Sequence, residues 1–195
     1  PNHGSFVPVQ AIRAVHSVVR QVAGLDPFHS AEELSSLVFT TFPGLYQMLP
    51  TTEKFNALDL YDPAVWPQQG PRPRSEILAK VKPVQQSLAK ADDRFFLIAG
   101  VNQDTVTNLR IEQSEFLYEQ TNEGDSTVPL AFCRLEGAKT YYVEESHGSL
   151  PNNRSVGNAV IDLIATGKTT VLSDQWTQVR RGPAQPLRDS ELRAP

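Results

Sequence analysis

An acidic and a basic side chain that could act together in catalysis stand in two short loops. "NEGDSTVP" (122–129) places Asp125 after Gly124 and before two hydroxyl residues, and "EESHGSLP" (144–151) contains His147. A neutral imidazole is a good general base when a neighbouring carboxylate fixes its tautomer and stabilises its charged form. The two residues therefore predict the acid and the base of a catalytic triad, whose nucleophile has to be sought elsewhere.

Each of these loops follows a segment with the pattern of extended chain. "EFLYEQT" (115–121) precedes the Asp125 loop, and "KTYYVEE" (139–145) precedes the His147 loop. In open α/β sheets, reactive groups gather beyond the carboxyl ends of the strands. Adjacent parallel strands would bring the two loops together. A single Gly-Asp is a common turn and a single histidine after a strand is an ordinary loop residue, but the pair in this order favours catalysis.

Apolar residues at helical spacing indicate that the first half of the chain is helical. They predict a helix over 7–24, a second from Ser30 onward and a third over 75–91. Ser30 and Glu33 have the spacing of a capping box. Pro83 predicts a kink or a break in the third helix.

The second half of the chain alternates strand and helix patterns, which predicts the α/β class. "RFFLIAGV" (94–101) is a near-continuous apolar run and predicts a strand that is covered on both faces. "TVTNLRI" (105–111) and "EFLYEQT" (115–121) predict a hairpin or two extended segments. "NNRSVGNAVIDLIATG" (152–167) predicts an amphipathic helix that ends at Gly167.

The composition argues against several classes of function. The chain has 195 residues, of which 39% are hydrophobic, so it can bury a core. Its net charge of -4 and the lack of a Lys/Arg run give no electrostatic basis for binding nucleic acid. The single cysteine, Cys133, excludes an internal disulfide and a cysteine-rich metal site, and no two histidines have zinc-site spacing. We therefore expect no cofactor, no metal and no nucleic-acid partner.

The two loops resemble a known protein family. "EGDSTVPLAFC" (123–133) and "YYVEESHGSLPNN" (141–153) are similar to the C-terminal half of α/β-hydrolases of the lecithin:cholesterol acyltransferase-like group. That group carries a Gly-Asp-Gly/Ser-Thr-Val-Pro acid loop, followed by a Tyr-x-x-x-x-x-His-type strand and loop. "PNHGS" (1–5) is similar to the Thr-Pro-x-x-Gly-Ser turn that follows the sixth strand. By this resemblance Asp125 is the acid and His147 is the base.

The resemblance implies a partial α/β-hydrolase fold with an inserted helical lid. Residues 1–5 would be a turn after a missing strand, residues 6–92 the lid, and residues 93–173 the C-terminal part of the core. The family implies a hydrolase or acyltransferase that acts on ester, lipid-like substrates. Residues 174–195 are polar and contain proline, and we expect them to form a tail of low order.

An apolar cluster in the lid region has two interpretations. As lid lining, its side chains could contact an acyl chain, because ligand pockets are mostly apolar. As the core of a small helical subdomain, they need no ligand. The cluster consists of Phe39, Phe42, Leu45, Tyr46, Met48 and Leu49.

The nucleophile of the predicted triad is not found in this sequence. Such a serine stands in a G-x-S-x-G turn, and no G-x-S-x-G occurs here. Either the serine lies upstream of Pro1, or a second chain supplies it, or the scaffold is a degenerate, non-catalytic binding module. Ser5 lies just before a helix and favours a turn or N-cap. Ser126 and Ser146 adjoin the acid and the base, where we expect orienting roles.

A sheet that lacks its central strands has an open edge. We expect the strand within 94–101 to expose an apolar edge and face, which favours pairing with another chain. The expected partners are therefore the missing N-terminal half or a second chain, and a homodimer is possible. The expected small-molecule partner is an ester or lipid-like substrate.

Overall fold

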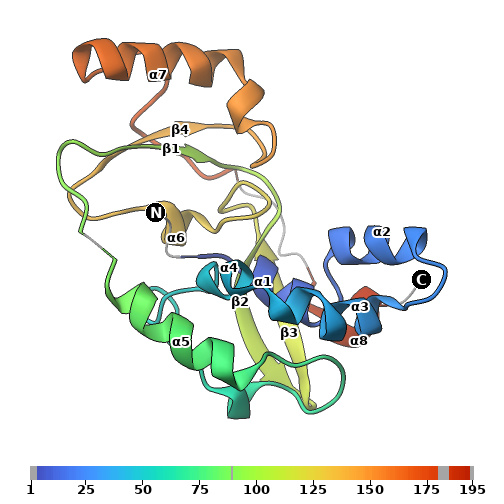
Figure 1. Ribbon diagram of the computed structural model, residues 1–195. Coiled ribbons are helices and arrows are strands. Elements are labelled where there is room, and N and C mark those ends of the chain that lie inside the picture. The colour runs from blue at the N-terminus through green and yellow to red at the C-terminus, as the bar shows by residue number, and fades with distance from the viewer. Residues whose placement is uncertain (1–3, 89, 180–184, 194–195) are drawn as a thin grey trace.

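The fold is mixed α/β and contains a parallel and an antiparallel sheet (Figure 1). The structure is a computed structural model, and it describes residues 4–88, 90–179 and 185–193. The strands are β1 (Phe96–Gly100), β2 (Thr105–Glu112), β3 (Glu115–Thr121), β4 (Lys139–Val143) and β5 (Leu187–Arg188). The α-helices are α1 (Val7–Ile12), α2 (Ser17–Leu25), α3 (Ala31–Leu37), α4 (Pro43–Gln47), α5 (Ser75–Gln86), α6 (Leu130–Cys133), α7 (Arg154–Thr166) and α8 (Asp189–Arg193). The predicted α/β class is confirmed at this level.

The parallel sheet consists of β1 and β4, which pair in register from Phe96 opposite Lys139 to Gly100 opposite Val143. The buried face of α7 packs on one side of this pair, where Figure 1 places the helix above the two strands. On the other side, Ala99 packs against Leu130 of α6. The prediction that β1 is covered on both faces is therefore borne out in part, because Phe96, Leu97 and Ile98 are only half-buried. Among the described residues, β1 pairs with β4 alone, so its other edge has no strand partner there.

The antiparallel sheet has the order β2, β3, β5. The β2–β3 hairpin follows the register Thr105 opposite Thr121 to Glu112 opposite Glu115, with a shift between Val106 and Asn108. This confirms the predicted hairpin. The hairpin is inserted in the connection between β1 and β4, and it does not join their sheet.

The main hydrophobic core joins the helical region to this hairpin. Apolar residues of α1, α4 and α5 pack in one cluster with residues of β2, β3 and α6. Trp66 is 1% exposed and lies edge-on to Phe116, with ring centroids 5.4 Å apart. Its Nε1–H donates to the carbonyl oxygen of Leu60 at 3.0 Å. The loop over residues 51–74 is therefore a packed part of the core.

The predicted helix over 7–24 is wrong, because the chain breaks between α1 and α2. Ala14 has φ 60, in the left-handed region, and this conformation interrupts the helical backbone. Arg13 at the break is buried. The His16 side chain then accepts the N–H of Val18 at 3.3 Å and caps α2. The break turns Val22 out of the core, where it is 41% exposed.

Other helix predictions fare better. The Ser30–Glu33 capping box at the start of α3 is confirmed. α7 ends at Gly167 in the left-handed conformation, as predicted. The third helix differs from its prediction, because α5 runs through Pro83 without a break and ends at Gln86, short of the predicted end at 91.

The expectation of a poorly ordered tail is wrong for residues 187–193. β5 pairs with β3, and α8 follows it directly. Asp189 at the start of α8 is fully buried, and its Oδ2 lies 2.8 Å from Nε of the equally buried Arg13. Its Oδ1 accepts the hydroxyl of Tyr118 at 2.7 Å. Polar composition suggests a solvated tail, but here the polar groups pair inside the protein.

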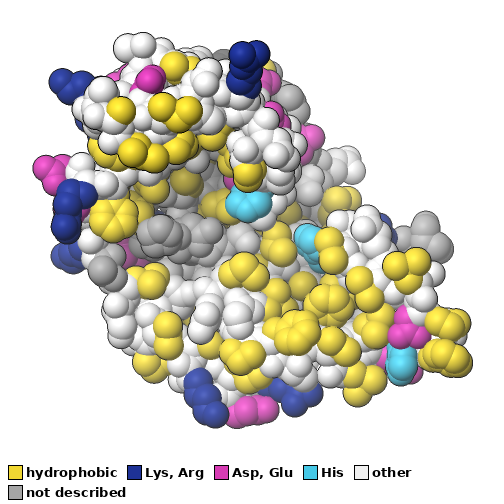
Figure 2. Space-filling view, turned by 45° about the horizontal axis from the view of Figure 1, so that its top comes forward, with side chains coloured by type: hydrophobic (Ala, Val, Ile, Leu, Met, Phe, Trp, Pro, Cys, Tyr) yellow, Lys and Arg dark blue, Asp and Glu magenta, His cyan; other side chains and the backbone are white. Residues whose placement is uncertain are grey.

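Several large apolar side chains lie on the surface, and apolar groups occupy much of the face in Figure 2. On α2, Val18, Val22 and Leu25 share one helical face and are 49%, 41% and 87% exposed. On the outer face of α7, Ile161 and Ile164 are 66% and 83% exposed. Within the described ranges, no helix has the length and apolar character needed to cross a membrane.

Breaking the buried ion pair should destabilise the whole fold. Asp189→Asn leaves the Arg13 charge buried without its partner, so we expect the free energy of unfolding to fall by about 3 kcal/mol. The measurement is urea denaturation followed by tryptophan fluorescence. The control is Ser190→Ala at the exposed neighbouring position, which should change stability by less than about 0.5 kcal/mol. Equal midpoints for Asp189→Asn and the unmodified protein would contradict this role.

Candidate functional site

Asp125 and His147 form the centre of the candidate site. Asp125 Oδ2 lies 2.8 Å from His147 Nδ1, although the residues are 22 positions apart in the chain. The Asp125 side chain is 8% exposed, whereas that of His147 is 49% exposed. The carboxylate is therefore enclosed by protein, while the imidazole reaches the surface.

The Asp125 carboxylate is held by its own loop. Its second oxygen, Oδ1, accepts the backbone N–H groups of Thr127 at 3.1 Å and of Val128 at 2.7 Å. The backbone N–H of Asp125 donates to the carbonyl oxygen of Val128 at 3.4 Å. One carboxylate oxygen thus fixes the turn and leaves the other directed at His147.

The loop that carries His147 is anchored at both ends. The backbone N–H of His147 donates to the carbonyl oxygen of Asp125 at 2.7 Å, so main chain as well as side chains join the two loops. Asn153 caps α7 through Oδ1 and donates from Nδ2 to Glu145 at 3.1 Å. This hydrogen bond, together with the N–H of Ser146, lowers the pKa of the Glu145 carboxyl. Glu145 thus stays ionised and ties the His147 loop to the start of α7.

The two loops meet at the carboxyl end of β1, where Gly100 allows a close approach. A Cβ atom on Gly100 would lie 2.4 Å from the carbonyl oxygen of Glu145 and 2.6 Å from the Cβ of Asp125. No side chain fits between these atoms. Glycine at this position therefore lets the acid loop and the base loop pack against the same strand end.

The acid loop reaches this place by a route that differs from the expected one. The sequence suggested that the strand before Asp125 lies beside the strand before His147, but β3 belongs to the antiparallel sheet. After β3 the chain returns to the end of β1, where Gln103 N–H donates to the Gly124 carbonyl at 3.1 Å and Gln103 forms a parallel bridge with Asp125. Asp125 therefore stands at the end of β1 and His147 follows the end of β4, and these two strands are adjacent.

The geometry matches the acid–base half of a triad. Because Nδ1 faces the carboxylate, we expect it to carry the proton of a neutral imidazole, which would leave Nε2 as the basic nitrogen. Within the described part of the chain, no hydroxyl or thiol is hydrogen-bonded to His147 Nε2. The pair can orient and stabilise an imidazolium, but it needs a nucleophile from another source.

The serines that sequence reasoning singled out occupy other positions. Ser5 is 4% exposed, and its Oγ accepts the N–H of Val7 at 3.3 Å, which fits the turn role. Its neighbour His3 lies outside the described residues. Ser146 Oγ lies 3.5 Å from Glu145 Oε1, and Ser126 donates its N–H to Thr105 Oγ1. Neither contact involves the side chain of Asp125 or His147, so the expected orienting roles of these two hydroxyls stay a prediction.

Among the described residues, the other histidines and acids suggest no further centre. Desolvation lowers the pKa of His16, which caps α2, and His29 Nδ1 lies 2.8 Å from Asp26 Oδ2 on the surface. Within the described ranges, no group of three or more His, Cys, Asp or Glu side chains could hold a metal ion.

The apolar cluster of the lid region divides between core and surface. Tyr46 and Leu49 are completely buried in the main core, whereas Phe42 and Met48 are 49% and 47% exposed. The core interpretation thus holds for the first pair. The exposed pair remains open to a ligand.

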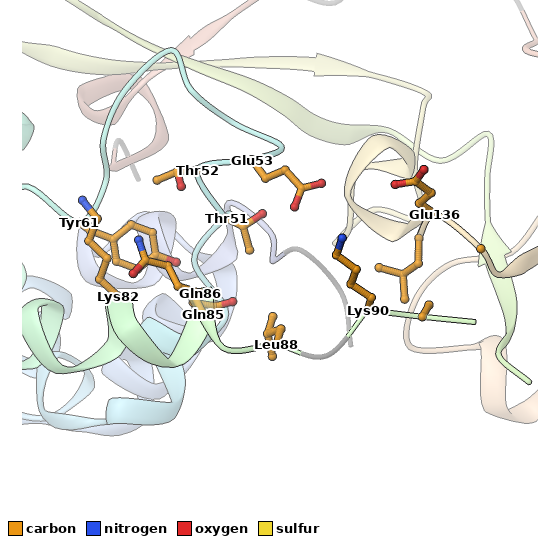
Figure 3. Close-up of a pocket in the computed structure, with 13 residues that line it drawn as sticks. Thr51, Thr52, Glu53, Tyr61, Lys82, Gln85, Gln86, Leu88, Lys90 and Glu136 are labelled. Carbon is orange, nitrogen blue, oxygen red and sulfur yellow. The ribbon is translucent and has the colours of Figure 1, made fainter. Parts of the chain in front are cut away.

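A cleft of about 580 Å³ lies between α5 and the segment that joins α6 to β4 (Figure 3). Lys82 and Tyr61 line one side of it, and Lys90 and Glu136 stand on the other. Neither Asp125 nor His147 lines it. Its charges are of both signs and favour no one ligand chemistry. The lining residues are Thr51, Thr52, Glu53, Tyr61, Lys82, Gln85, Gln86, Leu88, Lys90, Ala91, Leu135, Glu136 and Gly137.

Adding a methyl group at Gly100 should open the site. Gly100→Ala forces the two loops apart, so we expect the Asp125–His147 hydrogen bond to be lost and stability to fall by about 1–3 kcal/mol. Imidazole NMR of His147 and urea denaturation measure the two effects. Gly157→Ala on α7 is the control, because nothing lies within 4 Å of its added Cβ and alanine favours the helix. An intact hydrogen bond in Gly100→Ala would show that the close approach is not needed.

Cys133 should be unreactive in the native protein. Burial, followed by the charge of Asp125, raises the pKa of its thiol to about 11. The thiol therefore stays protonated at pH 8, and we expect alkylation by iodoacetamide to be slow until the pH approaches 11 or the protein unfolds. Rapid labelling of the folded protein at pH 7.5 would make Cys133 a candidate nucleophile.

Comparison with known proteins places the chain in no family. No family model, curated protein or solved structure matches it. The candidate site is therefore defined by its own geometry, in which a buried carboxylate orients a half-exposed imidazole at the ends of two parallel strands.

Proposed function

We propose that this chain carries the acid and the base of a serine hydrolase or acyltransferase that acts on ester, lipid-like substrates. In this proposal the sheet of β1 and β4 is the C-terminal part of an α/β-hydrolase core, and residues 6–92 form its lid. The serine belongs to residues upstream of Pro1 or to a second chain. The proposal includes no metal and no cofactor.

The observation that carries the proposal is the hydrogen bond of 2.8 Å between Asp125 Oδ2 and His147 Nδ1. The other carboxylate oxygen of Asp125 is bound by the backbone N–H groups of Thr127 and Val128, which leaves Oδ2 for His147. Here that arrangement sits beyond the carboxyl ends of adjacent parallel strands, where reactive groups gather in α/β sheets. This position of the pair supports the proposal.

The proposed reaction uses His147 twice. His147 Nε2 takes the proton from the serine hydroxyl as the serine oxygen attacks the ester carbonyl, and it returns that proton to the departing alcohol. Nε2 then takes a proton from water or an acceptor alcohol as that oxygen attacks the acyl-serine, and it gives the proton to the serine oxygen when the acyl–serine bond breaks, which frees the acyl product and restores the serine. Asp125 stabilises the imidazolium at each step.

The open edge of β1 is consistent with a core that continues beyond this chain. A further strand on that edge would add hydrogen bonds that the described residues leave unmade. A serine loop at the end of such a strand would stand on the same side of the sheet as Asp125 and His147. A further strand on the β1 edge, followed by a serine loop, would thus supply both the missing strand partner and the missing nucleophile.

A second candidate is a non-catalytic binding module on the same scaffold. It is favoured by the exposed apolar face of α2 and by a site without a hydroxyl on His147 Nε2 among the described residues. In this case the Asp125–His147 pair would serve only to join two loops.

A fluorophosphonate probe, which reacts with activated serines, tests the proposal. We expect labelling of the protein that includes the upstream residues or the second chain, and no labelling of the 195-residue chain alone. In the labelled protein, His147→Ala and Asp125→Asn should each lower ester turnover by about a thousandfold or more, because the base or its orientation is lost. Ser149→Ala, in the same loop, is the control and should keep near-normal turnover.

Three results would contradict the proposed hydrolase or acyltransferase function, each in a different way. Labelling of the chain alone would mean that a serine within it is activated. No labelling of the more complete protein would favour the binding module. Near-normal hydrolysis by His147→Ala would remove His147 from the mechanism.

A further inference from the structure

We propose that Thr105 is a positioning residue that holds the Asp125 loop in the shape needed to orient His147. The inference rests on the proposed acid–base function of that pair. Thr105 is the first residue of β2, and it is 1% exposed. It acts through the backbone of the loop, since its hydroxyl bonds to residues on either side of the site.

The Thr105 hydroxyl connects two segments that are far apart in sequence. Its Oγ1 accepts the N–H of Ser126 at 2.9 Å and donates to the carbonyl oxygen of Gln103 at 2.8 Å. The single hydroxyl proton is therefore committed, and the direction of the accepting lone pair is set. Gln103 lies shortly after the end of β1, and Ser126 directly follows Asp125. One side chain thus links the strand end to the acid loop.

The loop needs this support because Ser126 has an unfavourable backbone conformation. Its φ is 71, in the left-handed region that residues with a side chain rarely adopt. Such a conformation persists only when the surroundings hold it. It also places the next two N–H groups, of Thr127 and Val128, on Asp125 Oδ1. Loss of the hydrogen bond to Ser126 would therefore weaken the two backbone hydrogen bonds that hold the Asp125 carboxylate.

The backbone before the acid packs against both branches of the same side chain. A Cβ atom on Gly124 would lie 2.6 Å from Thr105 Oγ1 and 2.7 Å from Thr105 Cγ2. The loop from Gly124 to Ser126 therefore wraps closely around Thr105. Threonine supplies both a compact branched shape and a hydroxyl, and the two can be separated by mutation.

The matched substitutions are Thr105→Val and Thr105→Ser. Valine keeps the branched shape and removes the hydroxyl, whereas serine keeps the hydroxyl and removes the methyl group. The readout is the ¹⁵N NMR spectrum of the His147 ring at alkaline pH, which reports the fraction of neutral imidazole with its proton on Nδ1. Asp125→Ala in the same chain gives the reference spectrum for a His147 ring without its carboxylate partner.

We expect the unmodified chain and Thr105→Ser to hold the Nδ1–H tautomer. Thr105→Val should shift most of the population to the Nε2–H tautomer, toward the Asp125→Ala reference. A role in packing alone would predict the opposite order, because serine removes more volume than valine. If Thr105→Val does not fold, Thr105→Ala is used, and it must lose the Nδ1–H tautomer while folded.

The remaining outcomes separate the two proposals. A Nδ1–H tautomer that persists in Thr105→Val, or that is lost in Thr105→Ser, overturns the role of Thr105 and leaves the acid–base pair in place. An unmodified chain whose tautomer equals that of Asp125→Ala overturns the pair itself, and the role of Thr105 with it.

Discussion

The buried ion pair of Arg13 and Asp189 is the interaction on which the rest of the structure depends. It joins the end of α1 to the start of α8, near opposite ends of the chain, and Tyr118 of β3 adds a third partner. Arg13 also donates to the carbonyl oxygens of Pro67 and Pro71. A buried charge is tolerated only when it is fully paired, so these contacts must form together. They lock the helices, the long loop and the hairpin into one body.

That body supports the candidate site through the hairpin. β2 starts at Thr105 and β3 leads into the acid loop, so the strands that share the core with α1 and Trp66 also set where Asp125 lies. The parallel pair of β1 and β4 supplies the other half by placing His147 beside the end of β1. The packing of the core and the geometry of the candidate site are thus connected through short backbone contacts.

Much of the local structure follows from local sequence. The Ser30–Glu33 capping box, the glycine end of α7, the hairpin and the β1 and β4 strands are each encoded by a few neighbouring residues, and they were predicted. Two of the errors involve the same long-range contact. Arg13 lies beside the break at Ala14 and pairs with Asp189 at the start of α8, and no local pattern reports a contact between residues 176 positions apart.

The sequence by itself determined the α/β class and the two residues of the candidate site, since an aspartate in a Gly-Asp turn and a histidine after a strand are chemical patterns of short range. Only the tertiary structure decided how they meet. After the β2–β3 hairpin the chain returns to the end of β1, where Asp125 forms a bridge with Gln103. Gly100 leaves the space in which the Asp125 loop approaches the His147 loop. Thr105 could not be singled out in advance, because its hydroxyl matters through the backbone of Ser126 and Gln103, whose positions are set by packing.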